Sequence, residues 1–212
     1  TSAAPTVTET ATRTVTAIQK GRAIFTLMAS FHGDERGVSH QTPMPEVVGP
    51  EGLKSELDVA LEHQHLIPEA VRESVLCPKP IEIRRVNGYN PFNPKKSEPQ
   101  QYIWFRAAGE LPDDDHLHRY LFAYASDFNL LSTAALPHGI STWSPRMQVA
   151  SIDHAVWFHR PLRMDDWLLY AMDSPSASGA RGFSRGLVYN RAGELVASVA
   201  QESLMRERND GI

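Results

Sequence analysis

The sequence predicts an α+β fold in which one long antiparallel sheet wraps around a central helix. Three observations lead to this prediction. One helix-like stretch runs from Asp113 to Leu136, several long segments with strand-like alternation surround it, and one hairpin pattern occurs near both ends of the chain. A single helix must bury its apolar stripe, and a sheet of long strands is the available partner.

The predicted helix has start and stop signals. Pro112 and the acidic run after it favour a helix start, because carboxylates accept hydrogen bonds from the free amides of the first turn. Pro137 and Gly139 end the helix. At about 100° per residue, one narrow arc collects the apolar side chains expected to face the core: Leu117, Leu121, Tyr124, Phe128 and Leu131.

The other elements are predicted from periodicity and turn residues. Residues 12–31 form a hairpin that turns at Lys20-Gly21, residues 32–50 form a linker, and residues 51–75 hold two short helices broken at Pro68. A proline-rich loop over 90–99 separates the first two strands of the main sheet. The strands of this sheet are expected at 81–87, 101–109, 147–158, 167–177, 182–190 and 194–205.

The hairpin pattern indicates an internal repeat. When the two hairpin sequences are aligned at a constant offset, Arg13 aligns with Arg185 and Gly21 aligns with Gly193. Two unrelated hairpins with a shared glycine turn would give the same matches. If the repeat holds, residues 1–50 are the closing part of a first unit, 51–79 a helical linker, and 80–212 a second, complete unit. The first copy is then incomplete, and its hairpin should pair with strands outside these residues or with the second unit's sheet edge.

Composition excludes several classes of protein. The 212 residues are 42% hydrophobic with a formal net charge of −4, and Lys and Arg form no cluster of the kind that binds nucleic acid. No apolar run approaches the roughly 20 residues that span a bilayer, and the first residues do not resemble a signal peptide. A single cysteine, Cys77, cannot form an internal disulfide, and we expect it to be a small buried residue.

Two tempting motifs are rejected. Residues 182–186 read G-x-S-x-G, but a nucleophile elbow needs a helix after Ser184 and a histidine further along the chain. The residues after Ser184 alternate like a strand, and no histidine follows His159. A metal site is not predicted either. His154 and His159 lie five residues apart on an expected strand and so point to opposite faces, and we expect packing histidines with satisfied nitrogens.

Three polar residues occupy inward or nearly inward positions. Asp127 lies at the margin of the helix stripe, Ser151 faces with Val149 on its expected strand, and Gln201 follows Val199 on the inner face of the last strand. Each has a structural explanation when it is taken alone: an exposed margin residue, a small filler, and a position past the buried part of the strand. Together, a carboxylate, a hydroxyl and an amide can hold and activate a water molecule.

Long motifs resemble the acyl-CoA thioesterase II family, which has a double hot-dog fold. They are YASDFNLLSTAALPHG, ASIDHAVWFHRPLRMDDWLLY, SPSASGARGFSRG and GELVASVAQESLMR, and the similarity extends back to about residue 12. The resemblance implies that Asp127, Ser151 and Gln201 hold the hydrolytic water. Threonine is usual at the position of Ser151, and Ala29 stands in the first hairpin where the repeat has Gln201, so one repeat carries the site. The resemblance also implies that the first hot-dog opens well before Thr1.

The resemblance implies an acyl-CoA hydrolase that uses no metal, no cofactor and no covalent intermediate. Asp127 would be the base or water orienter, and backbone amides or Gln201 would stabilise the oxyanion. We expect an acyl-CoA substrate, a homo-oligomer, no nucleic-acid or membrane partner, and a cytoplasmic location. The alternatives are a non-catalytic acyl-CoA-binding or scaffold protein and a hot-dog dehydratase. The candidate cations for the coenzyme A phosphates are Arg146, Arg160, Arg163, Arg181 and Arg185.

Overall fold

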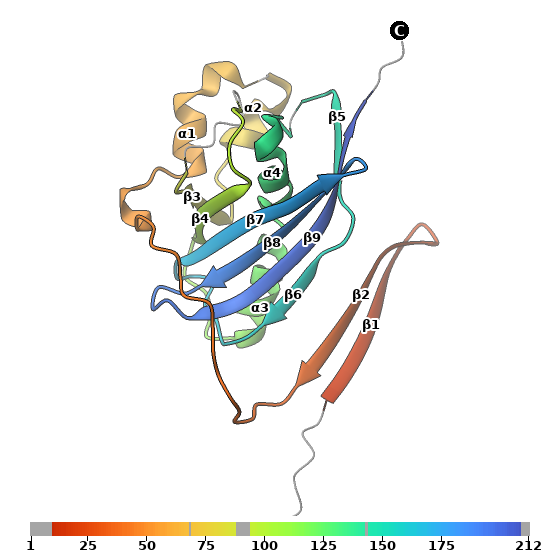
Figure 1. Ribbon diagram of the computed structural model, residues 1–212, viewed down its shortest axis with the longest axis vertical. Coiled ribbons are helices and arrows are strands. Elements are labelled where there is room, and N and C mark those ends of the chain that lie inside the picture. Colours follow the sequence, from red (N-terminus) through yellow and green to blue (C-terminus); the bar gives the residue numbers. More distant parts are fainter. Residues whose placement is uncertain (1–9, 68, 88–93, 143, 209–212) are drawn as a thin grey trace, which may run out of the picture. The chain divides into compact units, whose positions relative to one another are not determined.

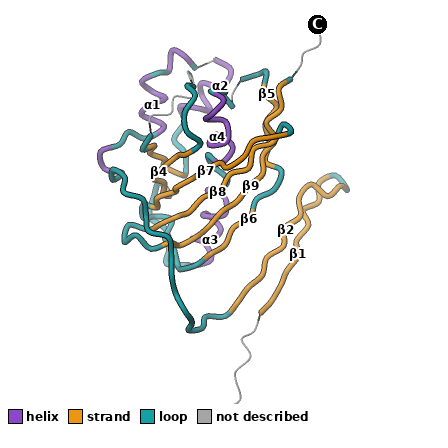
Figure 2. Tube along the Cα trace, viewed as in Figure 1, coloured by secondary structure: helices purple, strands orange, loops and turns teal. Residues whose placement is uncertain are grey.

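The structure is a computed structural model and describes residues 10–67, 69–87, 94–142 and 144–208. The chain divides into two compact units, residues 1–40 and 41–212. Figure 1 shows the elements of both units, and Figure 2 shows their secondary structure.

The first unit is the predicted hairpin. Strands β1 (Thr10–Gln19) and β2 (Arg22–His32) pair antiparallel in a two-stranded sheet. Lys20 and Gly21 both have positive φ, 50° and 75°, as the tight turn of a two-residue hairpin requires. Many of its large apolar side chains are exposed, namely Val15, Ile18, Ile24, Phe25, Leu27, Met28 and Phe31. The expectation that this hairpin pairs with further strands stays a prediction.

The second unit is built on a seven-stranded antiparallel sheet with the order β3-β4-β7-β8-β9-β5, and β6 also pairs with β9. Helices lie on one face of this curled sheet (Figure 1). The strands are β3 (Ile81–Arg85), β4 (Gln100–Ala107), β5 (Met147–Ser151), β6 (Ala155–Phe158), β7 (Leu168–Ser178), β8 (Arg181–Tyr189) and β9 (Leu195–Glu207). The helices are α1 (Glu56–Glu62), α2 (Glu69–Leu76), α3 (Asp115–Ala125) and α4 (Leu130–Ala135), with 3₁₀ turns η1 (Pro50–Gly52), η2 (Gln64–Leu66) and η3 (Leu136–His138). The predicted α+β arrangement is confirmed.

One face of the sheet packs against the helices, and part of the other face packs against the segment that precedes α1. On the helix side, Phe105, Phe122 and Tyr170 belong to the main core, and the Phe105 ring lies 6.2 Å from that of Phe122. On the other face, Trp104 and its neighbours pack against residues from the segment 41–53, whose Val48 carbonyl accepts a 2.8 Å hydrogen bond from Trp104 Nε1. Part of the predicted linker is therefore an extended strap bound to the sheet.

The predicted central helix is not continuous. Asp114 caps α3 as the acidic run predicts, and its carboxylate accepts hydrogen bonds from the amides of His116 and Leu117. The chain then leaves the helix after Ala125 and resumes at Leu130, with Asn129 in the left-handed region at φ 70°. The turn between α3 and α4 therefore holds Asp127, which sequence analysis placed on a helix margin.

The buried stripe of α3 is also displaced from the prediction. His118, Phe122 and Ala125 are the buried residues, whereas Leu117 and Leu121 are half-buried and Tyr124 is exposed. Phe128 and Leu131 are half-buried. The residues of the predicted apolar stripe are thus only partly buried. The last three of them, Tyr124, Phe128 and Leu131, line a cavity.

The expected strand at 147–158 is interrupted. Ser151 pairs with Ser203 and Ala155 pairs with Ala200, so β5 and β6 take one more residue than β9 over this interval. The amides of Ile152 and Asp153 both donate to the Glu202 carbonyl, and the Asp153 carboxylate accepts from the Glu202 amide. These non-local bonds stabilise a bulge, which changes the face on which later residues lie.

The G-x-S-x-G segment lies inside β8, as expected, and its residues have packing roles. Ser184 is buried and its hydroxyl donates to the Leu130 carbonyl of α4 at 2.8 Å. A Cβ atom at Gly186 would lie 2.0 Å from Cε2 of Tyr170, so the glycine lets that ring lie flat on the strand. The motif serves the contact between sheet and helix.

Other surface features complete the fold. Cys77 is exposed, so the expectation of a buried residue is wrong. It follows the last turn of α2, where the chain lies at the surface.

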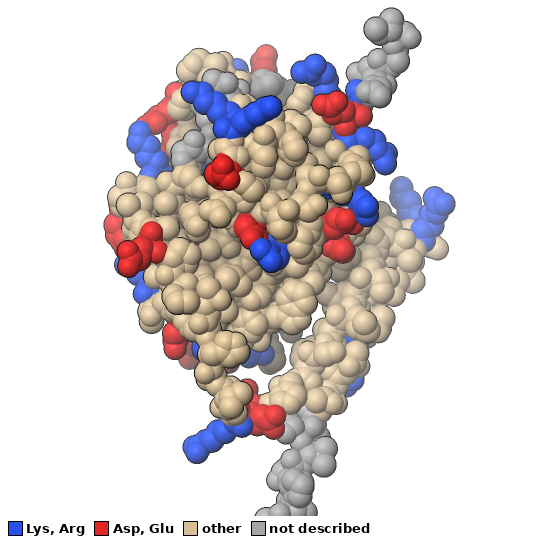
Figure 3. All heavy atoms as spheres, in the orientation of Figure 1, with Lys and Arg blue, Asp and Glu red and all other residues tan. Residues whose placement is uncertain are grey.

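In Figure 3, acidic and basic side chains are interspersed over the visible face. No helix in the described ranges is long and apolar enough to cross a membrane.

Candidate active site

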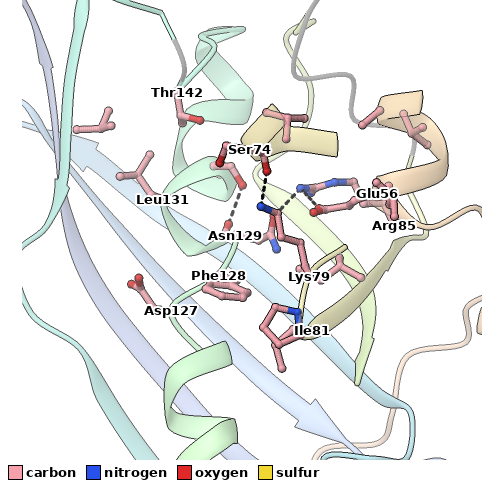
Figure 4. Close-up of a pocket in the computed structure, with 18 of the residues that line it drawn as sticks. Glu56, Ser74, Lys79, Ile81, Arg85, Asp127, Phe128, Asn129, Leu131 and Thr142 are labelled. Atoms are coloured by element: carbon pink, nitrogen blue, oxygen red, sulfur yellow. Dashed lines mark hydrogen bonds and ion pairs between the residues drawn. The ribbon is translucent and has the colours of Figure 1, made fainter. Parts of the chain in front are cut away.

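The three polar residues selected from the sequence lie together at one cavity. Ser151 Oγ donates to Asp127 Oδ1 at 2.9 Å, and Gln201 Nε2 donates to Ser151 Oγ at 3.2 Å. All three line a cavity of about 1010 Å³ in the second unit. Figure 4 shows Asp127 next to Phe128 on the turn between the two helices. The carboxylate, hydroxyl and amide therefore form one continuous hydrogen-bonded chain.

The turn that carries Asp127 is held on both sides. The preceding residue, Ser126, is buried, and its carbonyl accepts a 2.8 Å hydrogen bond from the hydroxyl of Tyr170 on β7. Asn129 accepts from Arg85 Nη2 of β3 at 2.6 Å, and its carbonyl accepts from Thr133 Oγ1. Burial raises the pKa of Tyr170 well above its usual value, and the nearby Asp127 charge adds to this rise. Tyr170 therefore stays a hydrogen-bond donor beside the carboxylate.

Gln201 lies within β9 and is 1% exposed, so its polar atoms must be satisfied by the protein. Its Nε2 donates both to Ser151 Oγ and to Ser203 Oγ, each at 3.2 Å. Its Oε1 lies 2.6 Å from Nδ1 of His154. Both amide hydrogens are thus used within the protein.

His154 was predicted to be a packing residue, but it lies against the candidate site. Its Nδ1 faces Gln201 and its Nε2 lies 2.8 Å from Oγ of Ser126, the residue before Asp127. An uninterrupted strand would point Ser151 and His154 to opposite faces, and the bulge after Ser151 brings them to one side. The only signal in the sequence that could have indicated a role for His154 was its position three residues after Ser151.

The expectation of satisfied ring nitrogens is confirmed for His154 and only in part for His159, and both histidines are exposed rather than packed in the core. The two ring nitrogens of His154 have partners, and Nε2 of His159 lies 2.8 Å from Oγ of Ser198. Burial, with a smaller effect of the Arg160 charge, lowers the pKa of His159. Among the described residues, no three His, Cys, Asp or Glu side chains are placed to hold one metal ion.

The rest of the cavity wall is mostly apolar. It comes from α1, α2 and the start of β3 on one side and from the two central helices and β5 on the other. Its apolar members are Leu57, Val59, Ala60, Val75, Pro80, Ile81, Ile83, Tyr124, Phe128, Leu131, Val149 and Ala150. Such a wall suits a hydrocarbon chain because the chain leaves water when it enters the cavity.

Three cations also line the cavity: Lys54, Lys79 and Arg85. Arg85 pairs with Glu56 at 2.5 Å, and Lys79 Nζ donates to the Ser74 carbonyl (Figure 4). Lys54 pairs with Glu62 at 2.5 Å. The arginines selected from the sequence are not among the described lining residues. Arg163, Arg181 and Arg185 pair instead with the carboxylates of Asp165, Glu202 and Asp173.

A curled antiparallel sheet packed on central helices is the arrangement of a hot-dog fold. A protein with a hot-dog fold from Alicyclobacillus acidocaldarius superposes with a TM-score of 0.69 at 18% identity and covers 94% of this chain and 68% of that chain. The acyl-CoA thioesterase II TesB2 from Mycobacterium marinum gives 0.74 at 38% identity, with 95% and 70% coverage. The predicted hot-dog fold is confirmed.

The chain belongs to the acyl-CoA thioesterase family. The model of that family, described as acyl-CoA thioesterase, matches residues 71–204. Acyl-CoA thioesterase 2 of Haemophilus influenzae is 38% identical over 91% of this chain and 67% of its own length. Acyl-coenzyme A thioesterase 8 of Mus musculus is 38% identical over 92% of this chain and 62% of its own length. The chain thus spans about two thirds of these relatives.

Proposed function

We propose that this chain hydrolyses fatty acyl-CoA to a free fatty acid and coenzyme A with a water molecule activated by Asp127. The observation that carries the proposal is the chain of hydrogen bonds from Gln201 through Ser151 to Asp127 at the wall of an apolar cavity. The names of the relatives supply the thioester as the substrate class.

The proposed reaction has two steps. The water oxygen attacks the thioester carbon while Asp127 takes a proton, which forms a tetrahedral intermediate. The intermediate then collapses, the carbon–sulfur bond breaks, and the proton on Asp127 passes to the departing sulfur. Because Ser203 and Ser151 already use both amide hydrogens of Gln201, the oxyanion would be stabilised by backbone amides rather than by this side chain.

The cavity suggests how the substrate lies. Its apolar wall suits the acyl chain, and Lys54 and Lys79 supply positive charge for the phosphates of coenzyme A. In the described chain Lys79 has no acidic partner, which leaves its charge for a ligand. As parts of the same proposal, residues 1–50 close a first hot-dog unit and the protein acts as a homo-oligomer in the cytoplasm.

The test is hydrolysis of a series of acyl-CoA substrates, followed with a thiol-reactive dye. We expect the parent chain to release coenzyme A and Asp127→Asn to lower kcat by about 10²- to 10⁴-fold, because Asn keeps the shape but cannot take the proton. Asp115→Asn on the exposed start of α3 is the matched control and should keep the parent rate. A thermal melt of each variant separates lost chemistry from lost folding.

Two results would overturn the proposal. If the parent chain binds acyl-CoA without releasing coenzyme A, it is the binding or scaffold protein of the alternative hypothesis. If folded Asp127→Asn hydrolyses acyl-CoA at the parent rate, Asp127 is not the base.

A further inference from the structure

His154 connects the two halves of the candidate site. One ring nitrogen lies 2.6 Å from Oε1 of Gln201 on β9, and the other lies 2.8 Å from Oγ of Ser126 on the turn that carries Asp127. Ser151 joins Gln201 to the same turn by a second route, because it accepts from Gln201 Nε2 and donates to Asp127.

We propose that His154 is a positioning residue that determines which way the Gln201 amide points. With Nδ1–H of His154 donating to Oε1, the amide nitrogen faces the hydroxyls of Ser151 and Ser203. The Ser151 hydroxyl then accepts from Gln201 and keeps its single proton for Asp127. This inference rests on the proposed function, because the orientation of the amide matters only if Asp127 works on a water.

The opposite orientation of the amide would disable this arrangement. If the Gln201 side chain turned over, Oε1 would face both serine hydroxyls and would attract their protons. Ser151 would then donate to the amide oxygen and not to Asp127, and the carboxylate would lose the contact that holds it at 2.9 Å. A donor at the Nδ1 position of His154 prevents this because the turned amide would place its NH2 group against Nδ1–H, and two donors that face each other repel.

The second ring nitrogen holds the turn. Ser126 Oγ lies 3.0 Å from the Ala123 carbonyl as well as 2.8 Å from His154 Nε2, so its one proton serves one of these two acceptors. A neutral ring accepts that proton, whereas a protonated ring donates to Ser126 and leaves the serine proton for Ala123. Nδ1 donates to Gln201 in both forms, so the orientation of the amide survives either state of the ring.

Three substitutions separate the two hydrogen bonds. His154→Leu removes both at similar volume. His154→Asn keeps a side-chain N–H near the position of Nδ1, and His154→Gln extends its amide toward the position of Nε2. We expect Leu and Gln to lower kcat about 10- to 100-fold with less than about a threefold change in KM, and Asn to stay within about fivefold of the parent.

A double-substitution cycle tests the route of the effect. If His154 acts through Gln201, then adding His154→Leu to Gln201→Ala should lower kcat by less than about twofold more. His159→Leu is the matched control because His159 contacts Ser198 and does not line the cavity; it should keep the parent kcat.

Each other outcome counts against the inference. Parent kcat in folded His154→Leu overturns it, and so does a full additional loss in the Gln201→Ala background. If His154→Leu does not fold, then equal activities of the Asn and Gln variants overturn it. These failures differ from failure of the proposed function, in which the parent chain is inactive or Asp127→Asn is fully active.

Discussion

The hydroxyl of Ser151 donates a 2.9 Å hydrogen bond to the carboxylate of Asp127, although the two residues lie 24 positions apart on different elements. A serine hydroxyl has one proton, so this bond leaves Ser151 only acceptor sites for other partners. One such site takes the Gln201 amide. A water bound beside this pair would therefore donate one hydrogen to Ser151 and the other to Asp127, which orients its lone pair toward a substrate.

Ser151→Ala should lower kcat about 10- to 100-fold, since a hydrogen bond to a charged group contributes roughly 1.5–3 kcal/mol. Ser151→Thr keeps the hydroxyl and should stay within about threefold of the parent. Steady-state acyl-CoA hydrolysis checks both variants. Equal rates for Ala and Thr would show that the hydroxyl has no role in the reaction.

Asp127→Asn and Gln201→Ala should be strongly non-additive. Both side chains act on Ser151, so the second substitution should cost much less in the background of the first. Gln201→Ala alone should cost less activity than Asp127→Asn. The measurement is kcat/KM for the parent, the two single variants and the double variant; a double variant with the product of both losses contradicts a shared water.

Gly186→Ala should destabilise the protein by about 1–3 kcal/mol, because its new Cβ would lie 2.0 Å from the ring of Tyr170. Activity should also fall, since Tyr170 holds the carbonyl of Ser126 beside Asp127. Gly109→Ala is the control, as nothing lies within 4 Å of a Cβ placed there. Equal urea midpoints for the two variants would refute the packing role of Gly186.

Asp165→Asn should lower the melting temperature at neutral pH but not in acid. The hydrogen bond from Arg163 is the main cause that lowers the pKa of Asp165, and the Leu111 amide adds to it. A lowered folded-state pKa gives stability that is present above the unfolded pKa near 4 and is lost as the pH falls through the folded value. The expected result is a difference in melting temperature at pH 7 that disappears near pH 2. A constant difference at both pH values would show a purely steric effect.

Local patterns were sufficient to predict much of the fold. The Lys20-Gly21 turn, the acidic cap before α3 and the strand position of Ser184 all follow from short-range preferences of the backbone. Asp127, Ser151 and Gln201 were selected because the pattern placed polar side chains at inward positions, where they need partners. The resemblance to the family motifs then indicated that the three residues belong to one site. In the structure only Gln201 is buried, whereas Asp127 and Ser151 are exposed.

The sequence by itself determined which elements form and which polar residues are candidates, whereas the tertiary structure decided how they meet. The break that puts Asp127 on a turn depends on bonds to Asn129 from β3, and the bulge that turns His154 toward Gln201 depends on bonds from Ile152 and Asp153 to β9. Periodicity likewise marks Tyr124 and Phe128 as apolar, but it cannot distinguish a buried core from a cavity wall. The break at Asp127 and the bulge before His154 both depend on contacts between residues far apart in the chain, and a local sequence pattern does not contain such contacts.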